Sequence, residues 1–287
     1  MKDFGIILVD KPSGISSFAV VHRMRKITGV KRIGHTGTLD PFASGLLPIC
    51  IGRATRLAGF VLAAEKEYIA NLKLGEQTDT ADLTGETIQT AEVPEITDGD
   101  LTEKLSGIME ITEQIPPRYS AIKVDGKRAY KMARENKDFQ MKPRVMQILD
   151  FEFLQHEKEN IQYRARVSKG TYIRTLSETI AERLGTVGTT TELRRIASGN
   201  MNICDAIALD DLNNENWQNY LADLSQIFCD YPQLILAEEN VQNFLHGRRF
   251  FVDFSDTENA LVLNEENEVF GFASIIERKV QPKIVLG

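Results

Sequence analysis

The residue of this chain best suited to do chemistry is Asp40, which lies in the segment GHTGTLDPFASGLLP. Three glycines and two prolines interrupt any regular period there, because Gly admits positive φ and Pro fixes φ and lacks an N–H. Pro41 biases Asp40 toward an extended conformation, and the apolar Leu39 before it limits its hydration. A carboxylate held in this way is a candidate nucleophile or base. The alternative from these residues alone is an Asp-Pro turn.

Five further segments follow a fixed order around this loop. They are DKPSGISS from Asp10, EKEYIA around Tyr68, PPRYSAIKVDGKRAYKMAR from Pro116, KGTYIRTL from Lys169 and ELRR from Glu192. Together with the loop they resemble the motifs of the TruB-type tRNA pseudouridine synthases, in which GHTGTLDP carries the catalytic aspartate. Several ordered matches are far more specific than any one of them.

The resemblance implies a catalytic pair, in which Arg174 keeps the Asp40 carboxylate ionised and oriented. It also implies that Tyr68 stacks on a uracil flipped out of the RNA and that His35 occupies the space this base leaves. From the residues alone, Tyr68 is a buried core aromatic, His35 is structural and Arg174 lies on a surface strand.

Four further positions take roles from the resemblance. Tyr172 and Leu193 line the uracil pocket, while Lys11 and Pro12 support the catalytic loop. Simple core packing of Leu193 is compatible with a pocket role. In the implied reaction the N1–C1′ bond of a uridine breaks and C5 bonds to C1′. The resemblance implies the TΨC-loop uridine at tRNA position 55.

Cofactor chemistry has no signature in this chain. It lacks a Walker loop, a dinucleotide-binding fingerprint and metal-ligand spacing, and the implied isomerisation needs no cofactor and no metal. Its three cysteines include no CxxC pair, which argues against a disulfide framework or a zinc site. No signal-peptide pattern or membrane-length apolar run occurs. We therefore expect a cytoplasmic monomer that binds tRNA and no membrane.

The net charge of -7 is unexpected for an RNA-binding protein. Positive charge is nevertheless concentrated where the motifs lie: residues 1–75 hold eleven Lys and Arg against five Asp and Glu, and residues 116–200 hold seventeen against ten. Residues 76–103 have nine acids and no base, and residues 201–287 have fifteen acids against five bases. This distribution predicts a basic cleft on an acidic body, although charge runs are also typical of solvated faces.

Hydrophobic periodicity predicts several elements that position the motifs. GIILVDKP is expected to be a strand ending at Pro12, followed by a helix capped by Ser16 or Ser17. Residues 161–168 alternate as a half-buried strand with a basic outer face. Leu176, Ile180 and Leu184 form a helical stripe that Gly185 ends. The Thr-rich acidic stretch 76–103 is expected to be a solvent-exposed insertion.

These elements predict an α+β fold, with a mixed, largely antiparallel sheet as the catalytic platform and flanking helices. We expect a catalytic domain over residues 1–230, with a basic RNA-gripping insertion at about 116–145. In that insertion Asn136 stands where the family usually has Gly.

Residues 231–287 resemble a PUA domain, a small RNA-binding β-barrel. They are expected to form short strands at FLHGRRFFVDF, ALVLNEENEVFGFASI and VQPKIVL, with a hairpin at Asn-Glu-Glu-Asn. The tail is acidic, so its RNA contact is expected to be weak or limited to its few basic residues, which are Arg248, Arg249, Arg278, Lys279 and Lys283.

Two other functions share these motifs. One is a guide-dependent pseudouridine synthase subunit of a ribonucleoprotein, which the basic arm at 116–144 argues against. The other is a non-catalytic tRNA-binding or folding protein, which the presence of Asp40, Arg174 and Tyr68 argues against.

Overall fold

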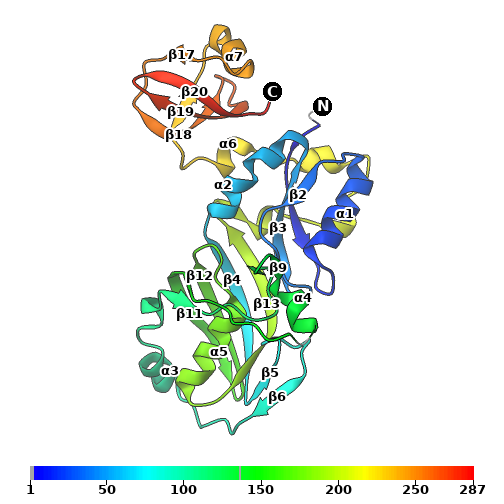
Figure 1. Ribbon diagram of the computed structural model, residues 1–287, viewed down its shortest axis with the longest axis vertical. Coiled ribbons are helices and arrows are strands. Elements are labelled where there is room, and N and C mark those ends of the chain that lie inside the picture. Colours follow the sequence, from blue (N-terminus) through cyan, green and yellow to red (C-terminus); the bar gives the residue numbers. More distant parts are fainter. Residues whose placement is uncertain (1–2, 136) are drawn as a thin grey trace. The chain divides into compact units, whose positions relative to one another are not determined.

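A computed structural model describes residues 3–135 and 137–287 of the chain (Figure 1). Asn136 therefore lies outside the described residues. The chain divides into two compact units. The first consists of Met1–Leu39, Leu46–Ala63 and Gly199–Gly287, and the second of Asp40–Gly45 and Ala64–Ser198.

The N-terminal part of the first unit contains the predicted strand and helix. Strand β1 (Gly5–Lys11) pairs in parallel with β15 (Ile207–Ala208), and β2 (Ile33–His35) pairs antiparallel with β3 (Ser44–Ile51). Helix α1 (Ser17–Thr28) begins at its N-cap Ser16, whose side chain accepts a bond from the Ala19 N–H, and ends at Gly29 with φ of 71°. The predicted strand ending before Pro12 and the predicted helix with its serine cap are both confirmed.

Short elements make up most of the remaining first unit. After β3 come a 3₁₀ helix (Gly52–Leu57) and α2 (Ala58–Ala63). The chain returns to this unit with β14 (Met201–Asn202), three single 3₁₀ turns (Ile203–Asp205, Leu209–Asp211, Trp217–Tyr220) and α6 (Leu224–Ile227).

A small C-terminal sheet completes the first unit, in the order β16-β18-β19-β20-β17. Its strands are β16 (Gln233–Ile235), β17 (Phe250–Phe251), β18 (Thr257–Leu263), β19 (Val269–Ile276) and β20 (Lys279–Val285), and α7 (Glu238–Leu245) precedes β17. The sheet curls into a half-barrel (Figure 1). The hairpin at Asn264 is confirmed, since β18 and β19 are antiparallel. Of the strand predicted over 244–254, only β17 forms, and the start is wrong, because residues 244–245 end helix α7, in which Val241 and Phe244 are buried.

The curled sheet shares a core with the N-terminal elements of its unit. Phe60 of α2 stacks on Phe272 of β19 with ring centroids 4.1 Å apart, and Phe228 and Tyr231 meet Phe272 edge to face. Arg53 and Arg56 donate to the carbonyls of Leu286 and Val285 at 3.2 and 2.5 Å. Burial of apolar area is the main stabilising term for such a core.

The second unit is built on an antiparallel sheet in the order β11-β12-β4-β13, with β13 also parallel to the first residues of β3. Its strands are β4 (Lys66–Leu74), β11 (Ile148–Glu157), β12 (Asn160–Val167) and β13 (Gly188–Ser198). Helix α5 (Ile173–Leu184) packs on β4 and β13 and ends at Gly185 with φ of 89°. The predicted strand, helix and α+β class are confirmed.

The acidic stretch is less exposed than predicted. It forms a hairpin of β5 (Glu76–Thr78) and β6 (Thr87–Thr90), then α3 (Asp98–Lys104) and a 3₁₀ turn (Ile108–Glu110). Thr78, Ala81 and Asp82 are buried. The expectation of a wholly solvent-exposed insertion is therefore wrong for the start of the hairpin, where polar side chains have partners inside the unit.

The basic arm begins and ends at a two-stranded ladder between β7 (Glu113–Gln114) and β10 (Arg144–Val145). Between them, β8 (Lys123–Val124) and β9 (Lys127–Arg128) form a hairpin, followed by α4 (Ala129–Arg134). Asp125 and Gly126 both have positive φ at the hairpin turn, as a tight two-residue connection requires. Within the described residues, no helix is long and apolar enough to cross a bilayer.

Candidate active site

The loop before Asp40 is fixed through the backbone of Leu39. The Ser17 hydroxyl accepts from the Leu39 N–H at 2.8 Å and donates to the Leu39 carbonyl at 2.9 Å. The Asp40 carbonyl then accepts from the Ala43 N–H at 3.1 Å, which closes a turn. Leu39, Phe42 and Ala43 are buried, whereas the Asp40 side chain keeps 35% of its surface exposed. The Asp-Pro turn is therefore present, and it presents the carboxylate.

Gly45 allows this loop to meet the sheet of the second unit. It pairs with Arg195 of β13 and has φ of 101°. A Cβ at this position would lie 2.3 Å from the Arg195 carbonyl oxygen, closer than any side chain tolerates. Gly is required here for close backbone approach as well as for the positive φ.

Arg174 is the buried partner of the Asp40 carboxylate. Its Nε lies 3.0 Å from Oδ2 of Asp40, and its side chain is only 3% exposed. Nη1 donates to the Thr80 carbonyl at 2.6 Å and lies 3.3 Å from Oδ2 of Asp82, while Nη2 donates to the Tyr119 carbonyl at 2.9 Å. A buried charge is tolerated only when it is paired and hydrogen-bonded in this way.

The surface strand expected for Arg174 from the residues alone is wrong, because the residue lies buried in the first turn of α5. From this position on the helix its guanidinium contacts both the Asp40 loop and the acidic hairpin. Asp82 was not singled out by sequence reasoning, since an acidic Thr-rich stretch is typical of a solvated segment. Its Oδ1 accepts from the Thr80 hydroxyl and from the N–H and hydroxyl of Thr84 at 2.9, 3.0 and 2.5 Å.

Tyr172 immediately precedes α5, and Gln114 holds its backbone. The Tyr172 N–H donates to Oε1 of Gln114 at 2.8 Å, and Nε2 of Gln114 donates to the Tyr172 carbonyl at 2.9 Å. Burial raises the pKa of the Tyr172 hydroxyl, and the Asp40 carboxylate adds to the rise against the opposing effects of Ser120, Arg174 and Arg144. Gln114 could not be identified from the sequence either, because no local pattern marks a buried glutamine as a partner for a residue 58 positions away.

Tyr68 and Leu193 lie on one face of the sheet. Leu193 is paired with Ala70 of β4, and Tyr68 lies two residues before Ala70, so all three point to the same side. Tyr163 is paired with Ala70 from β12 and bonds to Ser177 of α5 at 2.7 Å. This face is therefore the one that α5 covers. The side chains of Tyr68 and Leu193 are both buried.

The other predicted site residues lie in the first unit. The Lys11 ammonium is fully buried and donates to the carbonyls of Pro12 and Ile15 at 2.9 and 2.7 Å, so it stabilises its own loop. Pro12 is exposed. His35 lies in β2 and is paired with Ile49 of β3. The residue that holds the backbone before Asp40 is Ser17, which the sequence marked only as a possible helix cap.

The basic residues differ in how far their charge is neutralised. The outer face of β12 is less basic than expected, because Arg164 lies within 4 Å of Glu67, Asp150 and Glu152, and Arg166 lies 3.2 Å from Glu65. By contrast, the cations of the arm are exposed. They are Arg118, Lys123, Lys127, Arg128, Lys131, Arg134, Lys137, Lys142 and Arg144, of which Lys137 pairs with Glu135.

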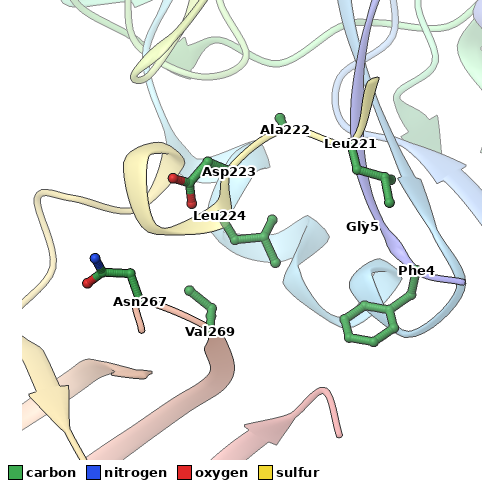
Figure 2. Close-up of a pocket in the computed structure, with 8 residues that line it drawn as sticks. All are labelled: Phe4, Gly5, Leu221, Ala222, Asp223, Leu224, Asn267 and Val269. Carbon is green, nitrogen blue, oxygen red and sulfur yellow. The ribbon is translucent and has the colours of Figure 1, made fainter. Parts of the chain in front are cut away.

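A pocket of about 210 Å³ lies in the first unit, and Figure 2 shows its lining. Phe4, Leu221, Leu224 and Val269 supply apolar walls, with Asp223 and Asn267 at its edge. The Asp223 carboxylate already accepts from the N–H and hydroxyl of Ser225 at 2.8 and 2.7 Å, as the N-cap of α6. None of the predicted site residues belongs to this lining.

Comparison with known proteins shows the family of this chain. The model of the TruB family pseudouridylate synthase N-terminal domain matches residues 25–173, and that of the tRNA pseudouridylate synthase B C-terminal domain matches residues 174–234. A tRNA pseudouridine synthase B from Clostridium kluyveri is 39% identical over 243 residues, which cover 85% of this chain and 84% of the relative. One from Francisella philomiragia is 37% identical over 283 residues, covering 97% and 93%.

A similar fold occurs in a chain of an H/ACA ribonucleoprotein bound to a substrate RNA containing 2′-deoxyuridine. Its TM-score is 0.73 at 22% identity, and the match covers 99% of this chain and 86% of the other. With the family models and the relatives, the chain belongs to the TruB family of pseudouridylate synthases, isomerases that convert uridine to pseudouridine.

Proposed function

We propose that this chain isomerises the uridine at position 55, in the TΨC loop of tRNA, to pseudouridine, and that it does so as a monomer without a guide RNA. The observation that carries the proposal is the buried Arg174, which binds an accessible Asp40 carboxylate in a chain whose relatives are tRNA pseudouridine synthases. The exposed cations of the arm support RNA binding, because Lys and Arg that neutralise phosphates supply most of the affinity.

The reaction begins when the target uridine leaves the base stack, which costs roughly a few kcal/mol. The uracil stacks on Tyr68 and packs against Tyr172 and Leu193, while His35 fills the space left in the RNA. Asp40 then acts on C1′, on C6 or on a sugar proton. The N1–C1′ bond breaks, the uracil turns, C5 bonds to C1′, and the hydrogen on C5 leaves to solvent as N1 takes a proton.

Arg174 has a positioning role in this scheme. One guanidinium contacts two carboxylates and is anchored by the buried one, so Asp40 keeps a fixed orientation through the steps in which charge moves. Lys11 and Pro12 fix the first-motif loop. Residues 231–287 act as a PUA-like domain that contributes a second, weaker RNA contact in the cytoplasm.

The proposal is tested by incubating the purified protein alone with a tRNA transcript tritiated at uridine C5. A matched transcript carries cytidine at position 55. We expect about one equivalent of tritium from the first transcript and none from the second. Release from both would move the target to another uridine. Tight tRNA binding without release would favour the guide-dependent subunit or the non-catalytic RNA-binding protein.

A further inference from the structure

Helix α1 carries an exposed aromatic residue within a segment that has no acidic residue. Residues 11–39 contain six Lys and Arg and neither Asp nor Glu. Phe18 is 64% exposed in the first turn of this helix. Single exposed apolar side chains are common on protein surfaces, so the exposure of Phe18 is not by itself evidence of a binding site. The surroundings of Phe18 decide its interpretation.

Two of the three Lys and Arg side chains of α1, Arg25 and Lys26, lie on the same side as Phe18, whereas Arg23 lies about 140° away and pairs with Asp210. At 100° per residue, Phe18, His22, Arg25 and Lys26 fall within roughly 100° of the helix circumference. The buried residues Val20 and Met24 lie on the other side. The Arg25 guanidinium lies 6.0 Å from the centroid of the Phe18 ring, at the limit of a cation–π contact. His22 and Lys26 are exposed, and Lys31 and Arg32 are exposed just beyond the helix.

The start of α1 is joined to the catalytic loop through the adjacent residue. Ser17, next to Phe18, binds both backbone groups of Leu39, and Leu39 precedes Asp40. An RNA segment that reaches Asp40 therefore passes close to the N-terminal turn of α1. When a base is flipped out of an RNA loop, its neighbour loses a stacking partner, and an aromatic ring beside the site replaces it.

Resting on the function proposed above, we infer that this face of α1 is a further RNA-contact surface, separate from the arm at 116–144 and from residues 231–287. An unpaired base next to the target uridine stacks on Phe18, and the flanking phosphates meet Lys26, Lys31 and Arg32. Stacking supplies an attraction that does not depend on sequence, whereas the cations supply one that depends on salt. The occupant is an unpaired RNA loop, because a fully paired duplex offers no free base face.

The test measures equilibrium binding of a TΨC-arm stem-loop and of a fully paired duplex of equal length, at several salt concentrations. Phe18→Ala is expected to weaken stem-loop binding about tenfold with an unchanged salt slope, and to leave duplex binding within about twofold. Phe18→Tyr should restore stem-loop binding. Lys26→Ala should reduce the slope of log K against log salt by about one.

Matched controls come from acidic parts of the chain. Tyr220→Ala removes an aromatic that is 40% exposed in the acidic segment 201–287, and Lys104→Ala removes an exposed cation that directly follows the acidic stretch 76–103. Neither should change affinity. Phe18 and Lys26 are exposed, so all variants should keep the wild-type melting temperature within about 2 °C.

Three results would overturn the inference: Phe18→Ala binding within twofold of wild type, equal losses for stem-loop and duplex, or a dimer that Phe18→Ala dissociates without loss of RNA affinity. The last would assign this face to a second copy of the chain. Tritium release by the wild type is measured in parallel. If the wild type releases tritium and Phe18→Ala binds normally, the α1 surface fails while the proposed function stands. If the wild type does not release tritium, the proposed function fails by itself.

Discussion

Nε of Arg174 lies 3.0 Å from Oδ2 of Asp40, and the same guanidinium lies 3.3 Å from Oδ2 of Asp82 through Nη1. The two carboxylates differ in exposure, at 35% for Asp40 and 6% for Asp82. Solvent therefore reaches the first, while the second stays inside the acidic hairpin. This difference supports the proposed division of roles, in which Asp40 meets the substrate and Asp82 positions the arginine.

Asp40→Asn should abolish tritium release and leave tRNA affinity within about threefold of wild type. Asparagine keeps the volume of aspartate and can still accept a bond from Arg174, but it has no negative charge with which to act as nucleophile or base. Single-turnover tritium release and filter binding measure the two quantities on the same preparation. A large loss of affinity would show that Asp40 is a structural residue.

Asp82→Asn should lower the turnover rate at least tenfold and the free energy of unfolding by about 1–3 kcal/mol, because a buried guanidinium loses its second counter-charge. The substrate KM should change little, since the arm is not altered. Urea unfolding and steady-state kinetics give both numbers.

The matched control for this variant is Glu86→Gln, the same charge change at an exposed position of the same hairpin. It should leave kcat and stability at wild-type values. Equal effects of the two substitutions would mean that only the net charge of the hairpin matters, and the positioning role of Asp82 would be lost.

Gln114→Glu should lower kcat about tenfold and leave KM within about threefold. A carboxylate can still accept from the Tyr172 N–H, but it cannot donate to the Tyr172 carbonyl, which then lacks the partner now 2.9 Å away. The negative charge would also lie in a buried position. Gln147→Glu, at an exposed glutamine in the same unit, is the control and should have no effect. A higher KM with normal kcat would place Gln114 in RNA binding instead.

The local elements of this fold could be predicted because each depends on its own periodicity and caps. α1 follows from Ser16, an apolar stripe and Gly29, and β12 follows from strict alternation. The helix α7 was missed because Gly247 and the two arginines after it interrupt the stripe within three turns, and the short apolar run then favours a strand.

The site could be predicted only in part, for a physical reason. Asp40 stands out because the loop chemistry around it is local, and its pairing with Arg174 was implied by family resemblance alone. Asp82 and Gln114 act through contacts across 92 and 58 positions of chain, which no local pattern encodes. The polar residues next to them in sequence are typical of a solvated segment. Only their contacts with Arg174 and Tyr172 in the folded chain show that both side chains are buried.

Lys66 should make the stability of this protein depend on pH in the alkaline range. Burial lowers the pKa of its ammonium from 10.5 to about 8, with Arg195 and Lys169 adding to the effect. Below pH 8 the Lys66 side chain is charged in both the folded and the unfolded protein, so the folded state bears the full cost of burying a charge. Between pH 8 and 10.5 the folded state loses the proton while the unfolded state keeps it, so stability rises with pH by up to about 1.4 kcal/mol per unit.

Lys66→Met removes this titration, because methionine has nearly the same length and no charge. The difference in unfolding free energy between variant and wild type should shift in favour of the wild type by about 1–2 kcal/mol from pH 7 to pH 9.5. Urea unfolding at both pH values measures it, and comparing two proteins cancels the groups they share. Lys158→Met, at an exposed lysine, should show no such shift. A constant difference for Lys66→Met would mean that Lys66 stays charged in the folded protein throughout this range, held by neighbours that outweigh its burial.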